Sequence, residues 1–172
     1  VNVYDNYFYN KISHNIERKN KKIVINWHGN RENGLEKWKR GIDLSKLKPL
    51  FSLPNISWIS VQKELEPNEK LFLKENNILD LSEQIDKGDK AFVDTTSIFL
   101  NSDLVISTDT SLLHLAATLK VETWGLITHI PEWRWGLNDN KTNWYPNMKI
   151  FRQSEILNWD NVVSELLIEL TK

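Results

Sequence analysis

The chain alternates short apolar runs with segments of helical period. Six runs are rich in β-branched and aromatic residues, and they span 23–27, 57–61, 78–81, 104–107, 123–127 and 149–151. Most are almost continuously apolar, which is typical of strands covered by helices on both faces. Candidate helices lie near 43–52, 66–76, 91–101, 110–120 and 159–171. This alternation predicts an α/β fold, a Rossmann-like doubly wound parallel sheet of about six strands.

Two segments depart from the alternation. Residues 1–22 are polar and aromatic, with a helical pattern around 10–19, and we expect them to lead into one domain at 23–172. Residues 128–148 contain two prolines and three tryptophans without a clear period. A loop of this length in a compact domain usually has a function or contains short irregular helices. We expect at least two of its tryptophans to be core residues, because large aromatic side chains usually pack inside.

Composition narrows the class of protein. A chain of 172 residues fits one domain, and a net charge of −1 gives no broad basic surface for a nucleic acid. No cysteine is present, which excludes disulfides, thiolate zinc sites and cysteine nucleophiles and suits a reducing cytoplasm. No apolar run reaches the ~20 residues that a bilayer span requires, so no membrane span is expected.

The clearest local feature is a strand-to-helix junction at 107–115. The strand ends at about Ser107, and the helix begins within three residues. The apolar stripe of this helix has the spacing i, i+3, i+4, i+7 and comprises Leu112, Leu115, Ala116 and Leu119. Ser111, His114 and Thr118 fall together on another side. The junction therefore places polar side chains beside the first turn of a helix, at the carboxyl edge of the predicted sheet.

The first turn of this helix predicts an anion site. Its amides have no partners within the helix, and the helix dipole favours negative charge there. The hydroxyls of Thr110 and Ser111, with His114 one turn further in, would complete a cradle for a diphosphate. An ordinary helix start explains the same residues equally well, with Thr108 or Asp109 as the cap and His114 merely packed.

The junction resembles an element of a known family. Residues 109–115 match the Asp-Thr-[Ser/Gly/Ala]-x-x-His-Leu element of heptosyltransferase-like (family 9-like) GT-B glycosyltransferases. The chain is more similar still to bacterial glycosyltransferases that are often fused behind tetratricopeptide repeats. Motifs of that group match, in the same order, at 27–30 (Trp-x-Gly-Asn), 40–44 (a basic turn), 60–63 (Ser-Leu-Gln-Lys), 94–95 (Asp-Thr), 131–135 (Pro-[Asp/Glu]-Trp-Arg-Trp) and 144–153 (Trp-Tyr-Pro-x-Met-x-[Leu/Ile]-Phe-Arg-Gln). Together they cover roughly residues 22–170, and their shared order makes the resemblance specific.

The resemblance implies the C-terminal, donor-binding half of a GT-B enzyme. Such a domain holds a nucleotide-diphosphate sugar at the carboxyl ends of its strands, with no cofactor and no divalent metal. The parent enzyme would transfer the sugar to an acceptor hydroxyl with inversion, using a general base supplied from an N-terminal acceptor-binding domain. The chain begins at Val1 and has about 22 residues before its first predicted strand, too few for that domain. The expected partners are therefore that domain and, by resemblance, tetratricopeptide repeats, and the catalytic residues are unknown.

Within this family, specific residues become candidates for the donor site. Arg40 is the first candidate cation for the diphosphate and Lys63 the second, although either could be a surface charge. Asp109 could accept hydrogen bonds from sugar hydroxyls or cap the helix. Gln62 could contact the base or ribose, or make a structural turn contact. The expected binding set is Arg40, Gln62, Lys63, Asp109, Thr110, Ser111 and His114.

Three positions depart from the family pattern. Gly41 follows Arg40 where a hydroxyl is usual, His28 replaces a commonly small residue, and Glu122 stands where a proline usually opens the fifth strand. Two other functions therefore stay open. The domain could bind a nucleotide sugar without activity, or it could serve mainly as a protein-interaction module beside repeats.

The tryptophans of 128–148 have an alternative role if the protein is an enzyme. They could then form a wall of the sugar pocket or of the interdomain cleft.

Overall fold

A computed structural model describes residues 12, 15, 19–34, 40–89, 91–137 and 140–172, so the helical pattern expected around 10–19 lies largely outside the described residues. Within them, six strands form one sheet with the order β3-β2-β1-β4-β5-β6, and every pairing is parallel. The strands are β1 (Lys21–Asn26), β2 (Ile56–Ser60), β3 (Leu79–Asp80), β4 (Leu104–Thr108), β5 (Thr123–Ile127) and β6 (Met148–Arg152). The predicted Rossmann-like, doubly wound α/β fold is confirmed.

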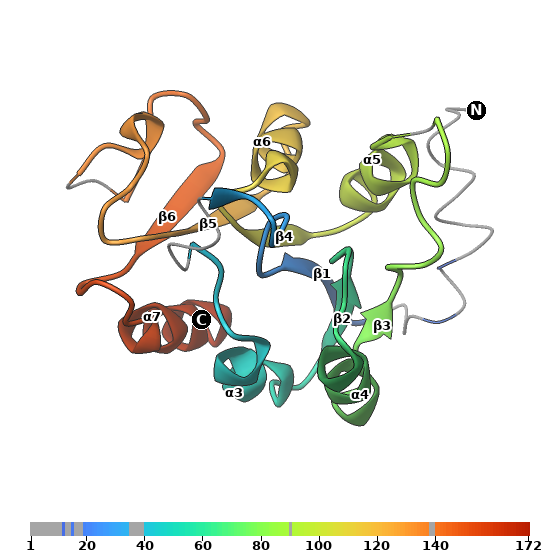
Figure 1. Ribbon diagram of the computed structural model, residues 1–172. Helices are drawn as coiled ribbons and strands as arrows, with labels where there is room; N and C mark the ends of the chain where they lie inside the picture. Colours follow the sequence, from blue (N-terminus) through green and yellow to red (C-terminus); the bar gives the residue numbers. More distant parts are fainter. Residues whose placement is uncertain (1–11, 13–14, 16–18, 35–39, 90, 138–139) are drawn as a thin grey trace.

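Helices cover both faces of the sheet (Figure 1). Helices α5 (Val93–Leu100) and α6 (Ser111–Thr118) lie on one face, and α3 (Lys48–Phe51), α4 (Pro67–Glu75) and α7 (Asp160–Leu170) lie on the other. The helix expected near 43–52 is divided into a 3-10 turn, η3 (Leu44–Leu47), and the short α3. Pro49 explains the division, because it cannot donate an amide hydrogen bond within one continuous helix.

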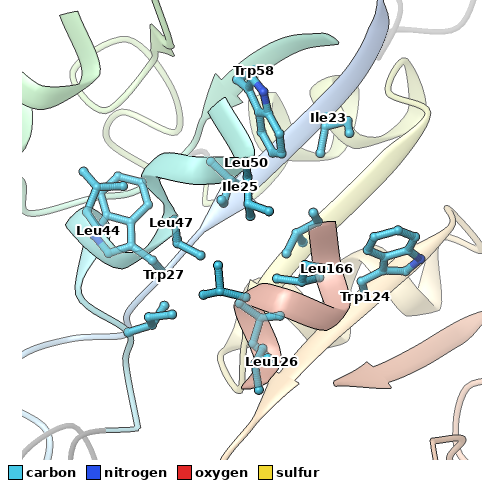
Figure 2. Packing of buried hydrophobic residues seen from close by; sticks show 14 of the residues in the cluster. Ile23, Ile25, Trp27, Leu44, Leu47, Leu50, Trp58, Trp124, Leu126 and Leu166 are labelled. Atoms are coloured by element: carbon cyan, nitrogen blue, oxygen red, sulfur yellow. The ribbon is translucent and has the colours of Figure 1, made fainter. Parts of the chain in front are cut away.

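The two-sided cover explains why the strands are almost continuously apolar. In β1 and just beyond it, Ile23, Ile25 and Trp27 alternate onto the face covered by α3 and α7 and join one buried cluster (Figure 2). Val24 points to the opposite face and packs with Ala116 of α6 in a second cluster. Because successive strand residues face opposite sides, both sets must be apolar when helices cover both faces. In the described part of the chain, no helix is long and apolar enough to cross a membrane.

Helix α6 is buried along two sides. The expected stripe packs against the cluster that α5 covers, and it consists of Leu112, Leu115, Ala116 and Leu119. Leu113 and Ala117 are buried in a separate cluster with Trp135 and Ile150. The second buried side arises because the helix also borders β5, β6 and the loop that joins them. The start of α6 is thereby held firmly at the carboxyl end of β4.

The strand order reverses between β1 and β4, which are neighbours in the sheet but distant in sequence. From β1 the chain steps outward through β2 and β3, and from β4 it steps outward through β5 and β6. Open parallel sheets bind ligands at the carboxyl ends of the strands beside such a reversal, because the connecting loops diverge there. The junction at 107–115 is the start of the connection that leaves β4 at this point.

Candidate functional site

A pocket of about 250 Å³ opens at the carboxyl ends of β1 and β2, beside the starts of α5 and α6. Of the expected binding residues, Gln62, Lys63, Thr110 and Ser111 line it. Arg40, Asp109 and His114 are not among its lining residues. The expected set therefore separates into a pocket group and a second group beside α6.

Buried polar side chains form the floor of the pocket. The amide nitrogen of Asn26 donates to Gln62 Oε1 at 2.8 Å. Asn26 Oδ1 accepts hydrogen bonds from the hydroxyls of Ser107 at 3.1 Å and Thr110 at 3.2 Å. This network joins the ends of β1 and β4 to the start of α6. Asn26 was not among the predicted binding residues, although a polar residue inside the apolar run 23–27 is a usable signal.

Gln62 brackets the turn that follows β1. Its Oε1 also accepts from the backbone amides of Trp27 and His28, both at 3.1 Å. Its Nε2 donates to the carbonyl oxygens of His28 at 3.1 Å and Lys63 at 2.9 Å. The structural turn contact is therefore present. Contact of Gln62 with a base or ribose remains a prediction, and the side chain is only 2% exposed.

Lys63 lines the pocket while its ammonium group is tied to neighbouring backbone. Its Nζ donates to the carbonyl oxygens of Ser82 at 3.1 Å and Ile85 at 2.5 Å. These contacts hold the lysine against the segment after β3. Lys63 would have to exchange them for phosphate oxygens to serve as the second cation, and that role also remains a prediction.

The start of α6 is open. Thr110 occupies the N-cap position without a side-chain cap bond, so neither Thr108 nor Asp109 caps the helix. The Thr110 hydroxyl instead joins the buried network on the pocket floor. Within the described residues, no acceptor is found for the amides of Ser111 and Leu112, and the first turn carries no acidic side chain.

The other long helices start differently. Helix α4 has a capping box formed by Glu66 and Glu69. In α5, both carboxylate oxygens of Asp86 accept from the helix start, including the amide of Asp94 at 2.9 Å. Helix α7 carries Asp160 in its first turn. Among these described helices, α6 is therefore the one with neither an acidic residue in its first turn nor a carboxylate hydrogen-bonded to its first amides.

Arg40, Asp109 and His114 stand in a row beside the start of α6. Arg40 Nη1 lies 3.9 Å from Asp109 Oδ2, and His114 Nε2 lies 3.9 Å from Asp109 Oδ1. His114 Nδ1 lies 2.9 Å from the Tyr145 hydroxyl. The Asp109 side chain is 13% exposed, so it is in a position to orient both neighbours. Tyr145 belongs to the motif at 144–153, but its contact with His114 was not predicted, because 31 residues separate the two.

Burial lowers the pKa of His114 below its ordinary value. The nearby guanidinium groups of Arg134 and Arg40 lower the pKa further, whereas the carboxylates of Asp109 and Glu132 oppose the shift. His114 is consequently a neutral imidazole near neutral pH, able to donate one N–H and accept at its other ring nitrogen.

The loop after β5 contains the short 3-10 helix η4 (Trp133–Trp135), as its length suggested. Trp135 is 1% exposed, but Trp133 is 67% and Trp144 is 53% exposed, so the expectation of at least two core tryptophans is wrong. The space between α6 and β6 accommodates the Trp135 indole together with aliphatic side chains. Trp133 and Trp144 lie outside it and pack edge-on at 5.4 Å.

A second pocket of about 520 Å³ lies on the other side of the turn after β1. Its wall contains Arg31, whose guanidinium group lies 2.8 Å from Glu69 and 2.9 Å from His28 Nε2. Glu69 also accepts from Trp27 Nε1 at 2.9 Å. His28 lines both pockets. Among the described residues, no three His, Asp or Glu side chains are grouped as a metal ion would require.

Comparison with known proteins shows the fold. No protein-family model matches the chain, and no curated protein matches it. The structure of E. coli ADP-heptose LPS heptosyltransferase II is similar with a TM-score of 0.60 and 10% identity, over 99% of this chain and 52% of that protein. E. coli heptosyltransferase WaaC with ADP-2-deoxy-2-fluoro heptose is similar with a TM-score of 0.54 and 15% identity, over 94% of this chain and 46% of that protein. The chain thus spans about half the length of these two enzymes and shares the fold of that half.

Proposed function

We propose that this chain is the donor-binding domain of a heptosyltransferase-like GT-B glycosyltransferase. Its ligand would be a nucleotide-diphosphate sugar, held without a divalent metal. The observation that carries this proposal is the open start of α6 beside the pocket, at the reversal of strand order between β1 and β4. The similarity of the fold to half of each of two heptosyltransferases supports the same assignment.

The diphosphate would lie at the first turn of α6. The amides of Ser111 and Leu112 point away from the helix body, as first-turn amides do, and the dipole makes that end attractive to an anion. The exposed hydroxyl of Ser111 adds a further donor. Arg40, held near Asp109, supplies a guanidinium group that can move onto phosphate oxygens. The pocket at the ends of β1 and β2 then receives the nucleoside.

The proposed reaction places its developing charge at this same end of α6. The acceptor hydroxyl oxygen attacks the anomeric carbon from the side opposite the diphosphate, which inverts the configuration. The bond from that carbon to the diphosphate oxygen breaks, and the oxygen leaves with the electron pair. Fixed donors and cations stabilise the charge that forms there, a role for the α6 amides and Arg40. The hydroxyl proton passes to a general base that we place in the acceptor-binding domain.

A second domain is part of this proposal. The similar heptosyltransferases are about twice as long as this chain. We place the acceptor site in an additional, N-terminal domain and regard neighbouring tetratricopeptide repeats as further partners. Aligning two reactants across a cleft provides much of the rate advantage of such transfers. The chain alone should therefore bind the donor without transferring its sugar.

The experiment is a calorimetric titration of the chain with UDP, GDP, ADP and CMP and with their sugar derivatives. The controls are the monophosphates UMP, GMP and AMP and the free sugars. We expect one diphosphate to bind at least about tenfold more tightly than its own monophosphate, since the second phosphate reaches the α6 amides. Equal affinity for the two, or binding of neither, would remove the diphosphate site from the account.

One feature favours a protein-interaction role as the second candidate. Ile130 is 72%, Trp133 67% and Leu137 73% exposed, and all three belong to the loop after β5. Clustered apolar side chains on a surface commonly mark a contact with another protein. A chain that bound no nucleotide in the titration yet associated with its neighbouring repeats through this loop would support that role instead.

A further inference from the structure

The imidazole of His114 is held from three sides. The Trp135 ring stacks on it with a centroid distance of 5.2 Å and an interplanar angle of 24°. The Tyr145 ring meets it edge-on at 5.7 Å, and the Tyr145 hydroxyl lies 2.9 Å from Nδ1. On the remaining side, Nε2 faces the Asp109 carboxylate at 3.9 Å. Each ring nitrogen therefore has a defined neighbour.

Those neighbours determine where the imidazole carries its proton. A neutral imidazole has one N–H, and a carboxylate can only accept hydrogen bonds. A bare lone pair at Nε2 would face the negative charge of Asp109, whereas an N–H there is attracted to it. At 3.9 Å this attraction only favours a proton on Nε2, whereas the Tyr145 hydroxyl lies within hydrogen-bond distance of Nδ1, at 2.9 Å, and fixes the proton on Nε2 when Nδ1 is the acceptor. The Tyr145 hydroxyl, which can donate or accept, must then donate to Nδ1.

The neutral form is the relevant one because burial lowers the pKa of His114. The charged groups that influence it are Asp109 and Glu132, which favour protonation, and Arg134 and Arg40, which oppose it. Near neutral pH the ring therefore has a choice of tautomer, and a single hydrogen bond can decide it.

We propose that Tyr145 is a positioning residue, which keeps the His114 N–H on Nε2 by donating to Nδ1, while Trp135 holds the ring plane. The Nε2–H is then directed toward Asp109 and the side of α6 where the helix begins. Under the proposed function, on which this consequence rests, the same N–H is a preformed donor for the donor diphosphate or its sugar. The loop after β5 thus has a specific role, which is to position a side chain of α6.

The loop is fastened in a way that suits this task. The Trp135 carbonyl oxygen accepts from Arg152 Nη2 at 2.8 Å, which ties η4 to β6. The Tyr145 carbonyl oxygen accepts from the Met148 amide at 3.1 Å, at the point where β6 begins. Both residues that hold His114 are thus attached directly to a strand of the sheet. A mobile surface loop could not determine a tautomer so reliably.

The direct test is nitrogen NMR of the imidazoles in the whole chain and in Tyr145→Phe. In wild type, the two ring nitrogens of His114, assigned by their loss in His114→Gln, should show well-separated shifts with the protonated position at Nε2. In Tyr145→Phe, which keeps the aromatic ring, the two shifts should converge as the tautomers mix. Trp144→Phe changes the neighbouring aromatic residue, which packs edge-on against Trp133, and should leave the wild-type pattern. Thermal unfolding should confirm that all variants are folded.

Binding of ADP and of inorganic pyrophosphate supplies the second readout. We expect Tyr145→Phe to weaken binding about twofold to tenfold, the effect of one neutral hydrogen bond. His114→Ala should weaken it at least as much, and adding Tyr145→Phe to His114→Ala should cause no further loss. An unchanged tautomer in Tyr145→Phe would overturn the proposal. A changed tautomer without binding of either ligand would support the positioning role and instead refute the proposed diphosphate site.

Discussion

The side-chain amide of Asn26 donates to Gln62 Oε1 at 2.8 Å, across neighbouring strands and in the interior. Gln62 then accepts two backbone amides from the turn after β1, so one side chain closes that turn. The floor of the pocket is consequently rigid before any ligand arrives. Preformed polar sites of this kind bind ligands without first having to order their own groups.

Replacing Gln62 with alanine should destabilise the protein. The substitution leaves the Asn26 amide and the amides of Trp27 and His28 without their buried acceptor, and unsatisfied donors are costly. We expect the free energy of unfolding to fall by about 2–4 kcal/mol. Chemical denaturation followed by tryptophan fluorescence measures it, with Lys74→Ala, an exposed position on α4, as the control. A loss below about 0.5 kcal/mol would show that the hydrogen bonds of Gln62 contribute little to stability.

The stability should also depend on the protonation of His114. Because its pKa is lowered in the folded protein, the unfolded chain takes up this proton at a higher pH than the folded protein does. Stability therefore decreases as the pH falls from about 6.5, the ordinary histidine value, through the folded pKa. His114→Gln should remove this part of the pH dependence. The free energy of unfolding of both proteins should be measured between pH 8 and pH 5. An equal change in the two proteins over this range would contradict the lowered pKa.

Nucleotide-diphosphate binding should survive removal of divalent metal. In the proposed site, the α6 amides and Arg40 meet the phosphate charge. The dissociation constant should therefore change by no more than about twofold between EDTA and excess magnesium. Calorimetry with the tightest-binding diphosphate measures this directly. A strict requirement for magnesium would replace the metal-free site with a metal-bridged one.

Sugar transfer should require more than this chain. In the proposed function this chain supplies only the donor side of the cleft, so the acceptor would not be held in line and the advantage of alignment, ~7–11 kcal/mol at best, would be lost. We expect a transfer assay to detect product with a longer protein that includes the upstream sequence, and none with the 172-residue chain. Robust transfer by the chain alone would redirect the search for a base to Asp109, His114 and His28.

The apolar runs were sufficient to predict the strands and helices because both faces of the sheet are covered. The position of α6 was also predictable, since its stripe has a clear helical period. The third strand has only two residues, Leu79–Asp80, within the four-residue run expected. As an edge strand it pairs on one side only, so the apolar pattern extends beyond the paired residues.

The site was less predictable because its contacts join residues that are far apart in sequence. Gln62 directly follows the apolar run 57–61, a position typical of ligand-binding residues. Its hydrogen-bond partners, however, are determined by the parallel register of β1 and β2. Periodicity also does not reveal which tryptophan of a loop reaches the core. Trp135 and Trp133 are two residues apart in one short 3-10 helix, yet one is buried and the other exposed.

The central claim is that the open start of α6 binds the donor diphosphate, and Ser111→Glu tests it most directly. Ser111 is the first residue of α6, is exposed and lines the pocket. A carboxylate there would give α6 the acidic first turn that α4, α5 and α7 already have. Acidic residues suit that end of a helix, so the free energy of unfolding should change by less than about 1 kcal/mol.

The matched control is Thr118→Glu, which makes the same charge change at the other end of the same helix. The measurement is the dissociation constant of the tightest-binding nucleotide diphosphate for wild type and both variants. Ser111→Glu should weaken binding at least about tenfold, or ~1.4 kcal/mol, whereas Thr118→Glu should stay close to wild type. Unchanged affinity in a folded Ser111→Glu protein, or an equal loss in both variants, would contradict the account.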